Sequence, residues 1–175
     1  GIFVHERHCD DPSLPRLAGW WGNDPESRFK MPRTFVPAKG ARSWQQSNAP
    51  VLSMAALKAS LDIFSAAGMM KVLRPKSEKL TAYLEFILKD INSSLTEPIL
   101  DIITPANPAR RGCQLSVVFK REGRRIFDQL AARGVIVDWR EPDVIRIAPV
   151  PLYNSFEDVF RLGHVLSEVI SEVVE

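Results

Sequence analysis

Cysteine is scarce in this sequence, which has only Cys9 and Cys113 among its 175 residues. Two cysteines so far apart do not form a disulfide framework, so the composition favours a reducing compartment and predicts a cytoplasmic protein. No histidine lies near Cys113, which begins an apolar run, so a buried structural cysteine is favoured over a nucleophile. The sequence also lacks both a secretory signal and an apolar run of the ~18 residues that span a bilayer, so we expect no membrane partner.

An excess of one charge is also absent. The 23 basic and 21 acidic residues are interspersed and leave a formal net charge of +2. Nucleic-acid-binding surfaces usually show a basic stripe with aromatic residues, whereas the densest basic runs here, at 110–111 and 120–125, are short. We interpret these runs as solvated surface and expect no nucleic-acid partner.

The sequence also offers few groups of residues that could bind a metal ion. His5, His8 and Cys9 are donor types suited to zinc, but they do not converge if the run IFVH at 2–5 forms a strand. The remaining histidine, His164, lies in a predicted helix. We therefore expect no metal site.

Apolar periodicity and turn residues predict the order of elements along the chain. A helix start near Pro50 follows from proline at the first helical position, with Ser47 or Asn48 as the cap, and Ser155 with Asp158 resembles a capping box. The predicted elements are a strand at 2–5, helices beginning near Pro50 and Arg74, strands at 99–104 and 113–119, a helix around 126–130 that ends at Gly134, strands at 135–139 and 144–148, and a helix from 156.

This order predicts an α+β fold over residues 72–175, with a small antiparallel or mixed sheet and helices packed on one face. Residues 50–71 are expected to be a connecting helix, and residues 1–49 the tail of another domain. The segment 10–49 is irregular and carries three of the four tryptophans, which need a surface to pack against. The first residues read like the interior of a strand with no initiator methionine, so we expect a fragment of a larger protein.

Arg146 is a charged residue inside the apolar strand VIRIA. Because side chains alternate between the two faces of a strand, the two isoleucines are expected to face the core and Arg146 to lie on the opposite face. An arginine fork matches a carboxylate or phosphate with two parallel hydrogen bonds, so Arg146 is a candidate anchor for an anionic ligand. From the strand alone, a salt bridge to Asp138, Glu141 or Asp143 is the favoured alternative.

Two further segments carry candidate ligand contacts. In GWWGNDPESRFKM, glycines bracket Trp20 and Trp21, whose indole N–H groups can donate to a ligand while their rings pack; an aromatic plug at an interface explains the same pattern. In QQSNAP, Ser47 and Asn48 precede a helix N-terminus, where backbone N–H groups bind anions; plain helix capping explains them equally well.

Four motifs, in their order along the chain, resemble the kynureninases: GWWGNDPESRFKM, SNAPVLSMAALKASLDIF, DIITP followed by RRGCQLSV, and RGVIVDWREPDVIRIAPVPLYNSFEDVF. The resemblance covers essentially the whole chain and points to the C-terminal portion of that family. The IRIAP strand alone is shared more widely among fold-type I pyridoxal-phosphate enzymes. The resemblance therefore implies the C-terminal small domain of such an enzyme, with residues 1–49 as the tail of the large cofactor-binding domain and its active-site loop.

The resemblance implies a homodimer that uses pyridoxal 5′-phosphate to hydrolyse the Cβ–Cγ bond of L-kynurenine or 3-hydroxykynurenine. The products are anthranilate or 3-hydroxyanthranilate and L-alanine, in tryptophan catabolism and NAD biosynthesis. It implies that Arg146 pairs with the substrate α-carboxylate, and that Trp20 and Asn48 reach the cofactor phosphate from the neighbouring subunit. Ser47 and Asn48 would border the substrate ring. The Schiff-base lysine of the family would lie upstream, so the chain alone should be inactive, and Asn23 departs from the histidine expected there.

Two other classes of function stay open. One is a stand-alone domain that binds small carboxylates through Arg146 or serves for dimerisation. The other is an interaction module whose tryptophan-rich loop docks on a partner.

Overall fold

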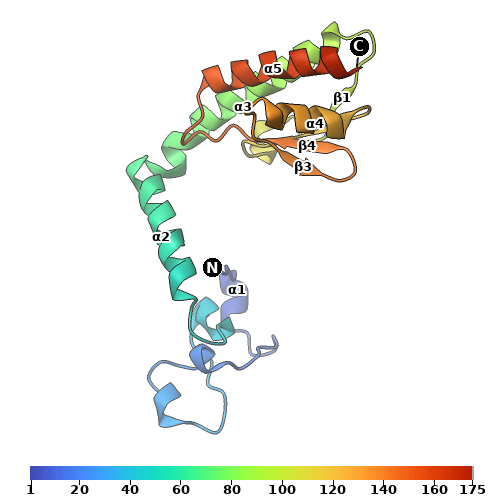
Figure 1. Ribbon diagram of the computed structural model, residues 1–175. Coiled ribbons are helices and arrows are strands. Elements are labelled where there is room, and N and C mark those ends of the chain that lie inside the picture. The colour runs from blue at the N-terminus through green and yellow to red at the C-terminus, as the bar shows by residue number, and fades with distance from the viewer. Residues whose placement is uncertain (175) are drawn as a thin grey trace. The chain divides into compact units, whose positions relative to one another are not determined.

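The computed structural model describes residues 1–174 and divides into two compact units (Figure 1). The first unit covers residues 1–59, and the second begins at Ser60. The boundary falls inside helix α2 (Val51–Ala66). Trp20, Ser47 and Asn48 belong to the first unit, and Arg146 belongs to the second.

The first unit consists of turns and short helices. It contains helix α1 (Glu6–Cys9) and the 3-10 turns η1 (Trp20–Gly22), η2 (Arg28–Lys30) and η3 (Gly40–Trp44). The strand predicted at 2–5 was wrong. Nothing among the described residues pairs with that segment, and a strand needs a hydrogen-bonded neighbour. His5 instead accepts a hydrogen bond from the backbone N–H of Arg7 and caps α1.

Two consecutive helices follow. The carbonyl of Pro50 accepts a hydrogen bond from Met54 at 2.9 Å, so α2 begins directly after this proline. Helix α3 (Met69–Ser94) begins before the predicted start at Arg74, because Gly68 takes a positive φ of 85° and α3 starts at the next residue. Taken singly, no helix within residues 1–174 is long and apolar enough to cross a membrane, although α2 and α3 together, bent by 75°, meet the length and composition.

The second unit is a four-stranded antiparallel sheet with helices on one face, as the sequence predicted (Figure 1). The strands lie in the order β1-β2-β4-β3. Helices α3, α4 and α5 cover one face and leave the other open. The bounds are β1 (Leu100–Ile102), β2 (Leu115–Phe119), α4 (Gly123–Ala132), β3 (Asp138–Arg140), β4 (Val144–Ile147) and α5 (Phe156–Val174).

Strand β3 begins three residues after the predicted start at Val135. The N–H of Val135 donates to the carbonyl of Leu130 at 2.9 Å, and Gly134 has a φ of +79°. These are the features of a helix C-terminus that closes on the residue after a left-handed glycine. The N–H of Val135 is therefore used to close the C-terminus of α4, so Val135 does not pair with β4.

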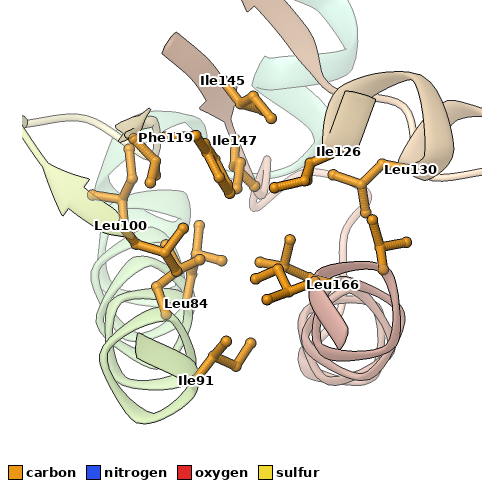
Figure 2. Packing of buried hydrophobic residues seen from close by; sticks show 14 of the residues in the cluster. Leu84, Ile91, Leu100, Phe119, Ile126, Leu130, Ile145, Ile147 and Leu166 are labelled. Atoms are coloured by element: carbon orange, nitrogen blue, oxygen red, sulfur yellow. The ribbon is translucent and has the colours of Figure 1, made fainter. Parts of the chain in front are cut away.

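The core lies between the sheet and the helices (Figure 2). Leu115, Val117 and Phe119 alternate with half-buried residues along β2, and all three are buried. Helix α5 places Leu166 against this layer, and its start is held by the predicted capping box. Ser155 Oγ accepts from the N–H of Asp158 at 3.1 Å, and the Asp158 carboxylate accepts from the N–H of Ser155 at 2.8 Å. The capping prediction is confirmed.

Glu85 on α3 is a mostly buried acid with two cationic partners. Its carboxylate accepts a hydrogen bond from Lys89 and pairs with Arg111 Nη2 at 2.6 Å, and the Glu85 side chain is only 15% exposed. The hydrogen bond from Lys89 is the largest cause that lowers the pKa of Glu85. Arg111 lowers this pKa further, while burial acts in the opposite direction.

We expect Glu85→Gln to make the melting temperature of the chain less sensitive to acid. A carboxyl whose pKa is lower in the folded state contributes stability above its unfolded pKa, about 4.3, and this stability is lost as pH falls through the folded pKa. Thermal melts at neutral pH should show a loss of about 1–3 kcal/mol, and the gap to the parent chain should narrow steadily as the pH falls below about 4. Glu78→Gln, which removes an exposed ion pair to Arg74 on the same helix, is the control. If the melting temperatures of Glu85→Gln and the parent chain differ by the same amount at every pH, the stabilising role of the Glu85 carboxylate is contradicted.

Candidate functional site

Arg146 lies on the open face of the sheet. Its neighbours Ile145 and Ile147 are buried under the helices, whereas the Arg146 side chain is 33% exposed. The alternation predicted from VIRIA is confirmed. The strand thus fixes the direction of the arginine more firmly than a loop would.

Asp138 is the direct partner of Arg146 across the hairpin of β3 and β4. The two residues are opposite each other in the antiparallel register. Asp138 Oδ2 accepts a hydrogen bond from Arg146 Nε at 2.5 Å and also pairs with Arg146 Nη2. Arg140, from the same face of β3, donates from Nε to the same oxygen at 3.0 Å. The salt bridge considered for Arg146 is therefore present, and its partner is Asp138.

The contact with Asp138 uses only one edge of the guanidinium. A guanidinium presents one pair of donors along Nε and Nη2 and a second along Nη1 and Nη2. Asp138 occupies the first pair. No hydrogen bond or ion pair of Arg146 Nη1 is seen among residues 1–174, so the second pair remains for a carboxylate on the open face. The salt bridge and the anion anchor are compatible.

The tryptophan loop and the SNAP segment come together in the first unit. A Cβ built on Gly19 would lie 2.1 Å from the Cα of Gln46, and one on Gly22 would lie 2.7 Å from the carbonyl oxygen of Ser43. Glycine is therefore required at both positions for the two backbones to approach this closely. Trp20 follows Gly19, and Ser47 follows Gln46. The contact thus brings together the two segments that carry the predicted phosphate donors.

Trp20 is held at its ring but leaves its polar atom available. The ring packs edge-to-face on Phe29 with 5.9 Å between centroids, and the residue is 53% exposed. Within residues 1–174 we find no hydrogen-bond partner for its indole N–H. Ser47 and Asn48 are also exposed, and the side-chain amide of Gln45 donates to the Ser47 carbonyl at 2.9 Å. These groups can donate to an anionic oxygen.

Two residues that sequence reasoning did not assign support this loop. Asn23 donates to the carbonyl of Gly19 at 3.3 Å and accepts from the N–H of Val36 at 3.1 Å. Arg28 is buried, and its guanidinium stacks on Trp21 at 4.5 Å. A cation spaced seven residues after a tryptophan pair gives no sequence signal, because the stacking depends on the turn between them.

The N-terminal histidines make local contacts. His8 Nε2 accepts from Arg7 at 2.8 Å, and the thiol of Cys9 contacts the carbonyl of Val4 at 3.5 Å. In the part of the chain that the structure describes, no three histidine, cysteine or acidic residues are grouped so that they could hold a metal ion.

Comparison with known protein families shows to which family this chain belongs. Residues 73–166, more than half of the chain, match the model of the kynureninase C-terminal domain. The chain belongs to the kynureninase family. Arg146 lies within the matched residues, whereas Trp20, Ser47 and Asn48 precede them.

Curated kynureninases match almost the whole chain. The protein from Flavobacterium johnsoniae is 54% identical over 170 residues, which are 97% of this chain and 40% of the relative. The protein from Xanthomonas oryzae pv. oryzae is 54% identical over 162 residues, which are 91% of this chain and 37% of the relative. The chain thus spans about 40% of the length of the kynureninases it matches.

Solved structures share the fold at low identity. A C-DES mutant with glycine covalently linked to its PLP cofactor superposes with a TM-score of 0.64 at 18% identity, over 86% of this chain and 37% of that one. A NifS-like protein gives a TM-score of 0.58 at 21% identity, over 80% of this chain and 41% of that one. The predicted α+β fold, a small antiparallel sheet with helices on one face, is confirmed, and these two solved structures share it.

Proposed function

We propose that this chain is the C-terminal part of a kynureninase that hydrolyses the Cβ–Cγ bond of L-kynurenine or 3-hydroxykynurenine. The products are anthranilate or 3-hydroxyanthranilate and L-alanine. Membership of the family supports the reaction. The observation that carries the assignment within this chain is the free donor edge of Arg146 on the open sheet face. This edge matches the α-carboxylate of an amino-acid substrate.

The donors of the tryptophan loop fit the phosphate of pyridoxal 5′-phosphate. We assign Trp20 and Asn48 to the phosphate and Ser47 with Asn48 to the edge of the substrate ring. An indole N–H and an amide can donate without adding charge, and both side chains are exposed in this structure. The cofactor, when bound, supplies an electron sink for the substrate. We place the lysine that holds the cofactor outside this sequence. The chain by itself therefore carries the substrate anchor but should be catalytically inactive.

The apolar surface of α2 supports a homodimer in which the site is shared between subunits. None of the residues of α2 is buried within the chain, and several of them are large and apolar. Such a surface is expected to be covered in the complete protein. The exposed large apolar residues of α2 are Val51, Leu52, Met54, Leu57, Leu61 and Ile63. We place the enzyme in the cytoplasm, in keeping with its low cysteine content.

Absorbance spectroscopy tests the proposal. We expect the full-length protein, meaning this chain joined to the rest of its kynureninase, to turn yellow with pyridoxal phosphate at neutral pH. The isolated chain should give only the spectrum of the free cofactor, because we place the lysine outside this sequence. A full-length protein that remains colourless and retains no cofactor after gel filtration would refute the proposed function.

The isolated chain also tests the alternative of a stand-alone carboxylate-binding domain. Arg146 alone offers one bidentate contact, which is too little for tight binding of a small acid. Calorimetry with L-alanine should therefore detect no binding to the isolated chain. Micromolar affinity that is lost in Arg146→Ala would favour the stand-alone domain.

A further inference from the structure

Asp138 holds Arg146 in a fixed orientation through one edge of its guanidinium. The carboxylate contacts both Nε and Nη2 of Arg146 with a single oxygen, and the two residues are paired directly across the hairpin. A free arginine at this position would rotate about four side-chain bonds. With the Nε edge engaged by Asp138, the edge of Nη1 and Nη2 faces another direction in the guanidinium plane.

We propose that Asp138 is a positioning residue for the substrate carboxylate and acts through Arg146. The inference rests on the proposed role of Arg146. The aspartate lies beside the arginine on the same face of the sheet and reaches it directly, so its carboxylate does not need to touch the substrate. It orders the side chain before binding and so reduces the entropy that is lost when the carboxylate docks.

Arg140 keeps this arrangement cationic. Two guanidinium groups share one carboxylate, so the cluster of Asp138, Arg140 and Arg146 retains a net positive charge. A simple pair of Arg146 with Asp138 would be neutral and would attract an anionic substrate less. The second arginine thus allows the aspartate to orient Arg146 without cancelling the field that attracts a carboxylate.

Replacing the aspartate separates two opposite expectations. Asp138→Asn removes a negative charge beside Arg146. If Asp138 only competes with the substrate for Arg146, the substitution should lower KM. If Asp138 positions Arg146, the substitution should raise KM. The structure supports the second result, because Asp138 blocks only the edge that the substrate does not need.

The experiment is steady-state kinetics of the full-length enzyme with kynurenine, together with calorimetry using L-alanine as the probe. We expect Asp138→Asn to raise KM about three- to tenfold with kcat changed less than about twofold, and to weaken L-alanine binding by the same factor. Asp138→Glu keeps the charge but moves it by one methylene. Its KM should lie between that of the unsubstituted enzyme and that of Asp138→Asn. This variant also serves if Asp138→Asn does not fold.

A matched control distinguishes positioning from a general effect on the sheet. Asp101 on β1 pairs with Lys120 at 3.1 Å and is similarly exposed, but it does not contact Arg146. Asp101→Asn should leave KM unchanged. In an Arg146→Ala background, Asp138→Asn should raise KM no further, because a residue that acts through the arginine has nothing left to position.

The outcomes separate this inference from the proposed function. If Arg146→Ala weakens binding but Asp138→Asn leaves KM unchanged or lowers it, the positioning role of Asp138 is overturned and the anchor stands. If Arg146→Ala itself leaves KM and L-alanine affinity unchanged, the proposed role of the arginine is the part that fails.

Discussion

Arg146→Ala should lower kcat/KM for kynurenine more than tenfold in the full-length enzyme. The substitution removes the proposed charge-assisted contact with the substrate α-carboxylate, and a contact of this kind contributes about 1.5–3 kcal/mol. Because the α-carboxylate does not change during the reaction, most of the loss should appear in KM. Steady-state kinetics with purified enzyme measures the effect.

Two variants sharpen this result. Arg146→Lys should rescue activity only in part, since an ammonium group keeps the charge but loses the planar fork. Arg140→Ala is the matched control, because it removes a guanidinium from the same face and the same carboxylate without touching the proposed anchor. If Arg140→Ala and Arg146→Ala lower kcat/KM equally, the sheet face attracts the substrate through its net charge alone and Arg146 is not a specific anchor. Unchanged kinetics in Arg146→Ala would rule out the anchor.

Gly19→Ala should weaken the affinity of the full-length enzyme for pyridoxal phosphate about tenfold or more. The added methyl group would lie 2.1 Å from the Cα of Gln46, so one of the two backbones must move. Overpacking of this kind costs about 1–3 kcal/mol, and here the strain falls between the segments that carry Trp20 and Ser47. Equilibrium dialysis with pyridoxal phosphate measures the change.

Gly112→Ala provides the comparison for this substitution. A Cβ at Gly112 meets no atom within 4 Å, so the variant should bind cofactor like the parent. The near-ultraviolet circular dichroism of the isolated chain should change in Gly19→Ala and not in Gly112→Ala, because the tryptophan environment depends on the loop. Cofactor affinity unaffected by Gly19→Ala would show that the loop contact is not needed to place the phosphate donors.

The second unit could be predicted well because its signals are local. Alternation of Leu115, Val117 and Phe119 is a period that only a half-buried strand explains. The capping box at Ser155 is likewise encoded within four residues. The strand at 2–5 was wrong because an apolar run specifies a strand only together with a partner, and the partner is not a local property.

The site could be predicted in part. The face of Arg146 followed from alternation, while the choice of Asp138 over Glu141 and Asp143 depended on the register of the hairpin. That register follows from the turn between β3 and β4, so counting outward from the turn is the signal that would have selected Asp138. The contact of Gly19 with Gln46 was beyond sequence reasoning, because it joins two irregular segments with no repeating pattern.

We infer that this chain supplies the substrate anchor of a kynureninase. The decisive measurement is the release of anthranilate, followed by its fluorescence, when the full-length enzyme with pyridoxal phosphate is mixed with L-kynurenine. We predict stoichiometric formation of anthranilate and L-alanine, with 3-hydroxykynurenine as the alternative substrate and a more than tenfold loss in Arg146→Ala. A cofactor-loaded enzyme that releases neither aromatic product from either kynurenine would contradict this role of the chain.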